Sequence, residues 1–207
     1  MTDTDLAVAP TRTAEIRGRA SGISILAFFA LAWTGWGTSN AVAGTTQTVV
    51  VVTAAVLSVV LIVLAWGRYR RAAVVRPDTV VRPDTAVHAA QSSPTGAPNG
   101  RHRFGLIVAA EWIGLGIVAF VLAAAGHPNA IPAVISLGVG IHFFPLARLF
   151  HVPAYLLTGA LMCLIAVTTL VLAPLTSTTA MWTALPGFGS ATVLYATCVK
   201  LLAESHR

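Results

Sequence analysis

Six long apolar runs, almost free of charged residues, constrain this chain more than any other feature. The runs are Ile23–Ala43, Thr46–Trp66, Phe104–Ala125, Ala130–Phe150, Pro153–Ala173 and Met181–Leu202. A bilayer core of about 30 Å needs about 20 residues of helix, and each run meets that length. In lipid a helix satisfies its own backbone hydrogen bonds, whereas a barrel strand would show about ten residues of alternating hydrophobicity. The sequence therefore predicts an all-α, polytopic membrane protein with six transmembrane helices.

The distribution of basic residues predicts the orientation of these helices. Only 10% of the residues are charged, against about 25% in a soluble domain. The net charge of +6 is compatible with nucleic-acid binding, but the position of the charges favours another explanation. All 13 Lys and Arg residues precede the first run, lie between runs two and three or four and five, or stand at the C-terminal end. Because cytoplasmic loops are enriched in Lys and Arg, this alternation predicts both termini inside the cell. We expect the lipid bilayer as partner, no nucleic acid, and a multi-pass location in a bacterial plasma membrane.

The apolar runs divide the chain into five predicted segments. These are a cytoplasmic tail (1–22), a transmembrane hairpin (23–66), a disordered cytoplasmic linker (67–103), a four-helix membrane bundle (104–202) and a cytoplasmic end (203–207). The linker holds a tandem repeat, V-V-R-P-D-T, at 74–79 and 80–85. We interpret it as a duplication in a tolerant linker, with a docking peptide as the alternative.

The N-terminal region has a second interpretation. A basic stretch precedes the first apolar run, and Ala41-Val42-Ala43 fits the small-residue pattern of a signal-peptide cleavage site. Cleavage after Ala43 would leave five helices and would not change their orientation. The leader would be long, and its apolar run merges into a full span, so the sequence favours an uncleaved helix.

Glu111 is the only acidic residue inside a predicted span. A charge at membrane depth costs at least about 2.5 kcal/mol, so Glu111 is expected to face the bundle interior and to have a partner. The third run begins near Arg103 and the fourth ends near Arg148, at the same membrane face. At the rise of a helix, Glu111 then lies about 12 Å and His142 about 9 Å from that face. The two side chains are therefore expected in one layer, as a pair between adjacent helices.

Three neighbours complete the predicted polar site. Pro145 cannot donate a backbone hydrogen bond, which leaves an acceptor carbonyl next to His142. Arg148 has a side chain long enough to extend towards this layer, and Trp112, beside Glu111, would supply an aromatic wall. The site is predicted to bind a proton or a small ligand. In the alternative, Glu111 and His142 form a structural clamp between two helices.

The end of the fourth run carries a distinctive motif. It reads G-I-H-F-F-P-L-A-R-L-F over 140–150 and continues as V-P-A-Y over 152–155. This stretch resembles part of a family of small bacterial multi-span integral membrane proteins. In that family G-x-H-F-F/L-P ends one helix, and a short basic turn leads into a helix that opens with an aromatic residue. The resemblance covers the third to fifth runs. It implies the membrane class and draws attention to His142 and Pro145, but it implies no reaction.

Other chemistries lack their sequence patterns. Only His142 lies deep in a run, so a haem held by two histidines is not expected. The sequence has no zinc-ligand spacing, no H-E-x-x-H and no phosphate-binding Gly-rich motif. Gly-Phe-Gly-Ser-Ala at 187–191 lacks the G-x-S-x-G form of a nucleophile turn and favours helix packing. We therefore expect no cofactor and no metal.

Two functions remain open. The first is a small proton-linked transporter or permease that uses the layer of Glu111 and His142. The second is a non-enzymatic accessory or scaffold protein, as a monomer or a homo-oligomer, in which the two residues form a clamp. An enzyme is a distant third. The two functions differ in whether this layer is open to water.

Overall fold

The computed structural model describes residues 12–74 and 98–204, and every regular element in these ranges is a helix. The elements are α1 (Arg12–Thr38), α2 (Gly44–Val74), α4 (Pro98–Ala124), the 3-10 helix η1 (Pro128–Ala130), α5 (Ile131–Phe150), α6 (Ala154–Leu172), the 3-10 helix η2 (Ala173–Leu175) and α7 (Ala180–Glu204). The all-α prediction is confirmed for these ranges. The start of the predicted tail (1–11), the linker over 75–97 with most of its repeat, and residues 205–207 lie outside the described residues.

In the part of the chain that the structure describes, five helices are long and apolar enough to cross a membrane. Their membrane-compatible parts are Arg19–Thr38, Gly44–Arg71, Pro128–Phe150, Ala154–Leu175 and Ala180–Glu204. In α4 the described apolar part, Glu111–Ala124, is shorter, so the sixth span remains a prediction. On α2 the outward face carries Val52, Val56 and Val63, all exposed. A water-soluble bundle would place polar residues on such a face, so the chain has the character of a multi-pass membrane protein.

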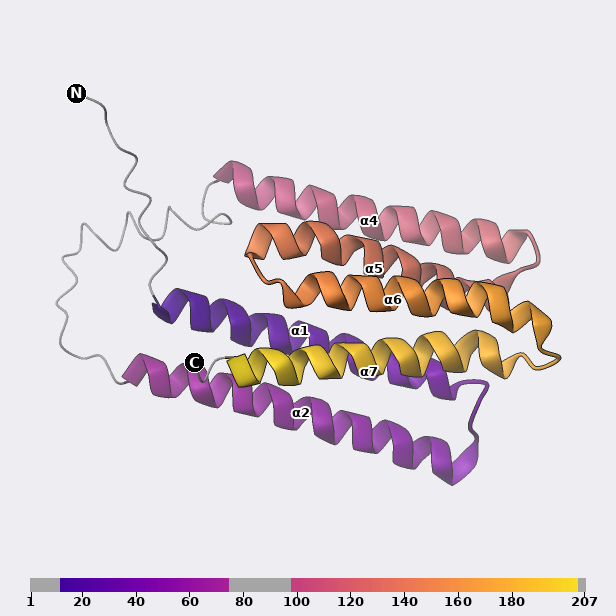
Figure 1. The fold of residues 1–207 in the computed structure, drawn as a ribbon, viewed down its shortest axis with the longest axis horizontal. Coiled ribbons are helices and arrows are strands. Elements are labelled where there is room, and N and C mark those ends of the chain that lie inside the picture. Colours follow the sequence, from indigo (N-terminus) through magenta and orange to yellow (C-terminus); the bar gives the residue numbers. More distant parts are fainter. Residues whose placement is uncertain (1–11, 75–97, 205–207) are drawn as a thin grey trace.

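Helix α7 lies at the centre of the bundle (Figure 1). It packs along α1 and α6 and also contacts α5 and α2. Helix α1 packs along α2, and α5 packs along α6. Helix α4 lies at one edge, and its main contacts within the described part of the chain are with α5 and η1 (Figure 1).

The alternating helix directions gather basic side chains at one end of the bundle. The starts of α1, α4 and α6 and the ends of α2, α5 and α7 all lie there (Figure 1). We call it the basic end and define it by Arg19, Arg68, Arg70, Arg71, Arg148 and Lys200. This grouping follows from the same alternation that predicted the orientation.

Two glycine pairs allow helices to cross at short range. A Cβ on Gly37 of α1 would lie 3.0 Å from the backbone nitrogen of Phe188 in α7, and a Cβ on Gly187 would collide with the backbone of Gly37. Between α5 and α6, a Cβ on Gly159 would lie 2.6 Å from the carbonyl oxygen of Gly140. Small residues allow such backbone contact in membrane helices. The packing role predicted for Gly187 is thus confirmed.

Three hydroxyl pairs connect α7 to its neighbours. They are Ser190–Ser136 on α5 (2.9 Å), Thr197–Thr158 on α6 (2.7 Å) and Tyr195–Ser58 on α2 (2.8 Å). Among the described side chains, no buried nitrogen or oxygen atom lacks a hydrogen-bond partner. Inside a helix bundle an unpaired buried polar group is costly, so these hydrogen bonds help to stabilise the fold. Each interhelical bond adds about 0.6 kcal/mol on average, so the pairs mainly fix which helix faces meet.

Three helices extend past the ends of the apolar runs into the neighbouring polar segments. Helix α1 begins at Arg12, inside the range predicted as a tail, while α2 continues to Val74 and α4 begins at Pro98, inside the predicted linker. Hydropathy marks only the part of a helix that lipid can surround. The backbone continues as a helix while its residues tolerate that conformation.

The turn between α1 and α2 corrects one predicted boundary. The gap between the apolar runs placed it at residues 44–45, whereas the structure places it at residues 39–43. The hydroxyl of Thr38 donates to the carbonyl of Gly35 (2.8 Å), and that of Ser39 donates to the carbonyl of Trp36 (2.7 Å). These bonds satisfy carbonyl groups that the end of a helix leaves open. Gly44 then starts α2 with a φ of 63°, a conformation that glycine adopts readily.

Candidate functional site

Glu111 of α4 and His142 of α5 meet between their helices. Nδ1 of His142 lies 2.6 Å from Oε2 of Glu111. The histidine side chain is 18% exposed and that of the glutamate 19%. Helices α4 and α5 are consecutive and antiparallel, joined by a short turn through Gly126 and η1. The depths of Glu111 and His142 are therefore measured from the same end of the bundle. The contact that their similar depths predicted is present. We call these two residues the acid–imidazole pair.

A second contact between α4 and α5 lies one helical turn from the acid–imidazole pair. A Cβ on Gly138 would occupy the place of the Leu115 side chain, so Gly138 makes room for Leu115. Leu115 follows Glu111 by four residues, and Gly138 precedes His142 by four, which places each on the same helix face as its neighbour. The pair is thus one level of a continuous seam between the helices. Gly138 thus allows close packing of α4 against α5.

The other three predicted site residues do not join the pair. Helix α5 runs unbroken through Pro145, which is exposed. Arg148 is also exposed, and among the described residues it makes no ion pair with the pair's carboxylate. Trp112 is 57% exposed and stacks on Phe29 of α1, with ring centroids 6.2 Å apart and an interplanar angle of 26°. The structure thus brings Glu111 and His142 into contact, and the wider site of five residues remains a prediction.

Phe29 and Leu115 were not expected around this site, and neither was the contact of Leu115 with Gly138. Phe29 is one of many apolar residues in its run, and no charge or motif distinguishes it. Neither Leu115 nor Gly138 stands out in the sequence. Their contact can be inferred only by counting residues along both helices from Glu111 and His142. A search for an apolar residue and a glycine at matching depth would have found them.

The chemistry of the pair is proton exchange between a carboxylate and an imidazole. At 2.6 Å the imidazole nitrogen and the carboxylate oxygen are in direct contact, and such a contact is strong when at least one partner is charged. In the part of the chain that the structure describes, no three His, Cys, Asp or Glu residues are placed to hold a metal ion.

Comparisons with known proteins found no match for this chain. The chain matches no family model, no curated protein and no solved structure. What the fold and the site define is a class: a helical bundle of membrane character with an acid–imidazole pair between two helices. The resemblance of the G-I-H-F-F-P motif to a family of small bacterial membrane proteins remains a prediction.

Proposed function

We propose that this chain is a small proton-linked transporter or permease of a bacterial plasma membrane, with six spans and both termini in the cytoplasm. The acid–imidazole pair takes up and releases the coupling proton. The observation that carries the proposal is the 2.6 Å contact between Glu111 on α4 and His142 on α5, with both side chains still partly exposed. Ionisable residues in spans are expensive and typically mark proton relays or substrate paths. The bacterial location rests on the resemblance described above.

The position of α4 supports a mechanism. This helix lies at the edge of the bundle and its main contacts are with α5 and η1. The acid–imidazole pair is a polar tie between α4 and the rest of the bundle. A change in its protonation alters the strength of that tie, and the equilibrium between two positions of α4 shifts accordingly. Rigid movement of one element against a fixed group is the common basis of alternating access.

The test is the unfolding temperature as a function of pH. Purified wild-type protein and the Glu111→Gln variant are heated at several values between about pH 5 and 8. Glutamine keeps the shape and can accept a hydrogen bond, but it does not titrate. We expect a pH-dependent midpoint in the wild type and a flatter profile in the variant, because the variant loses one of the two titrating groups of the pair. Glu204→Gln, at the exposed ion pair with Lys200, is the control and should keep the wild-type profile. Parallel curves for wild type and Glu111→Gln would contradict proton binding at this pair.

A second function is favoured by the packing of the seam. Because Leu115 and Gly138 interlock one turn from the pair, Glu111 and His142 also fit a clamp in an accessory or scaffold protein. The two proposals differ in access to water. A water-soluble carbodiimide, with modification at Glu111 measured by peptide mass spectrometry, separates them. A transporter should be modified at Glu111 as well as at the exposed Glu204, whereas a dry clamp should be modified at Glu204 and not at Glu111.

A further inference from the structure

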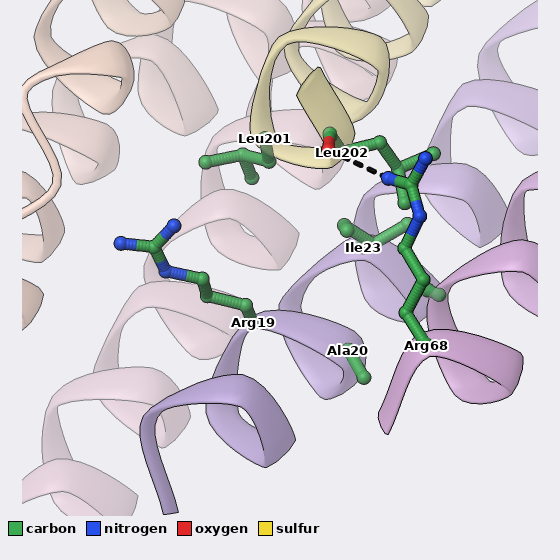
Figure 2. A pocket seen from close by; sticks show the side chains of 7 residues that line it. Arg19, Ala20, Ile23, Arg68, Leu201 and Leu202 are labelled. Atoms are coloured by element: carbon green, nitrogen blue, oxygen red, sulfur yellow. Dashed lines mark hydrogen bonds between the residues drawn. The ribbon is translucent and has the colours of Figure 1, made fainter. Parts of the chain in front are cut away.

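A pocket opens at the basic end between α1, α2 and α7. Its lining consists of Arg19, Ala20, Ile23, Ala65, Arg68, Leu201 and Leu202. The five apolar residues of the lining are buried in the bundle. Figure 2 shows Arg19 and Arg68 on two sides of these apolar residues. The pocket therefore combines an apolar floor with two cationic walls that come from different helices.

One wall of the pocket is fixed by the end of α7. Nη1 of Arg68 donates to the carbonyl oxygen of Leu202 at 2.6 Å (Figure 2). This carbonyl belongs to the last turn of the helix, where cationic side chains bind favourably. A guanidinium group has five N–H donors in a rigid planar fork that matches the oxygens of a phosphate. The bond to Leu202 thus orients a phosphate-binding group at the mouth of the pocket.

Aromatic residues place the pocket at the level of lipid headgroups. Trp66 and Tyr69 of α2 form a perpendicular ring pair with centroids 5.6 Å apart. Nε1 of Trp66 donates to the hydroxyl of Ser24 at 3.1 Å, next to Ile23 of the pocket floor. Trp and Tyr concentrate where a membrane helix meets the headgroup region. The apolar floor then faces the acyl boundary, and the two arginines face the headgroups.

Basic residues are concentrated around the pocket. The basic end carries Arg70, Arg71, Arg148 and Lys200 in addition to the two pocket arginines. Among the side chains that the structure describes, Glu204 is the acidic one at this end, and it lies 3.9 Å from Lys200. An anion that approaches the pocket therefore meets a positive field before it makes contact.

We propose that this pocket binds one anionic phospholipid, with its phosphate held by Arg19 and Arg68 and the start of an acyl chain against the apolar floor. A free phosphate ion would use the two arginines only. A phospholipid with a net negative charge uses both halves of the pocket, and the surrounding bilayer supplies it. This inference does not depend on proton transport by the acid–imidazole pair.

The experiment measures the unfolding temperature of purified protein in uncharged detergent during titration with phosphatidylglycerol. A ligand that binds only the folded state raises the midpoint. Arg19→Gln is expected to raise the half-maximal lipid concentration more than tenfold. The control is Arg71→Gln, an exposed arginine at the same end but outside the pocket. It should change that concentration by roughly fivefold or less, the general attraction of one basic residue to anionic lipid.

Further variants and ligands distinguish lipid binding from the binding of free phosphate and from a loss of folding. Arg68→Lys and Arg19→Lys keep the positive charge if the glutamine variants do not fold, and each should weaken binding because the planar fork is lost. Phosphatidylcholine and inorganic phosphate should raise the midpoint less than phosphatidylglycerol does. Equal effects of Arg19→Gln and Arg71→Gln would overturn the proposal, since the attraction would then be spread over the surface. Equal stabilisation by inorganic phosphate would also overturn it, by assigning the arginines to a soluble anion.

Discussion

Gly187→Ala is expected to lower the free energy of unfolding by about 3 kcal/mol, at the upper end of the usual cost of overpacking. The added methyl group would meet the Cα and backbone nitrogen of Gly37 and would lie 3.0 Å from the carbonyl oxygen of Trp33. All three are backbone atoms, which no rotamer change can move aside. Helices α1 and α7 would have to separate at the centre of the bundle. Reversible unfolding of purified protein in mixed micelles measures the change.

Two glycines of α1 provide matched controls for that result. A Cβ on Gly37 would lie 3.0 Å from the nearest backbone atom of α7, so Gly37→Ala should be destabilising but less so than Gly187→Ala. A Cβ on Gly35 would meet nothing within 4 Å. Gly35→Ala should be neutral or up to about 1 kcal/mol more stable, because alanine favours the helix. If all three variants unfolded alike, the α1–α7 crossing would not be the close contact described here.

The helical class could be predicted from sequence because lipid imposes a length and forbids unpaired backbone groups. The glycine contacts show where that reasoning ends. Gly37, Gly114, Gly116 and Gly187 all lie in apolar helices, yet a Cβ on Gly114 or Gly116 would meet nothing within 4 Å. Glycine indicates that a close approach is permitted but does not identify the partner. The partner depends on which helices are neighbours, and a nearly uniform apolar composition carries little of that information.

The contact of Glu111 with His142 could be predicted because charged groups in the runs are scarce and depth follows directly from residue number. Depth does not give the direction in which a side chain points around its helix. Arg148 follows His142 by six residues, a rotation of about 240°, so it lies on another face of α5. Trp112 is about 100° from Glu111 and reaches Phe29 of α1 instead. Nearness in depth therefore does not by itself place Arg148 or Trp112 beside the acid–imidazole pair.

A double-mutant cycle on the acid–imidazole pair is expected to show strong non-additivity. Glu111→Ala leaves the imidazole without its partner between α4 and α5, and His142→Ala leaves the carboxylate in the same position. Each single variant should lose stability, and the double variant should lose little more than either, because no unpaired polar group is then left. For groups in direct contact we expect a coupling free energy of about 1–3 kcal/mol. Unfolding in mixed micelles at one fixed pH gives the four values that the cycle needs.

Lys200 and Glu204 provide the reference cycle for this measurement. They lie four residues apart on α7 with a 3.9 Å separation, and their side chains are exposed. Such pairs contribute about 0.3–0.5 kcal/mol, so their coupling should be several times weaker than that of the acid–imidazole pair. Additive losses at Glu111 and His142 would show that the two side chains do not interact in the folded protein. Both the transporter and the clamp proposals would then fail together, since each requires the contact. Strong coupling supports the contact alone, and the pH profile of Glu111→Gln then decides whether the contact carries a mobile proton.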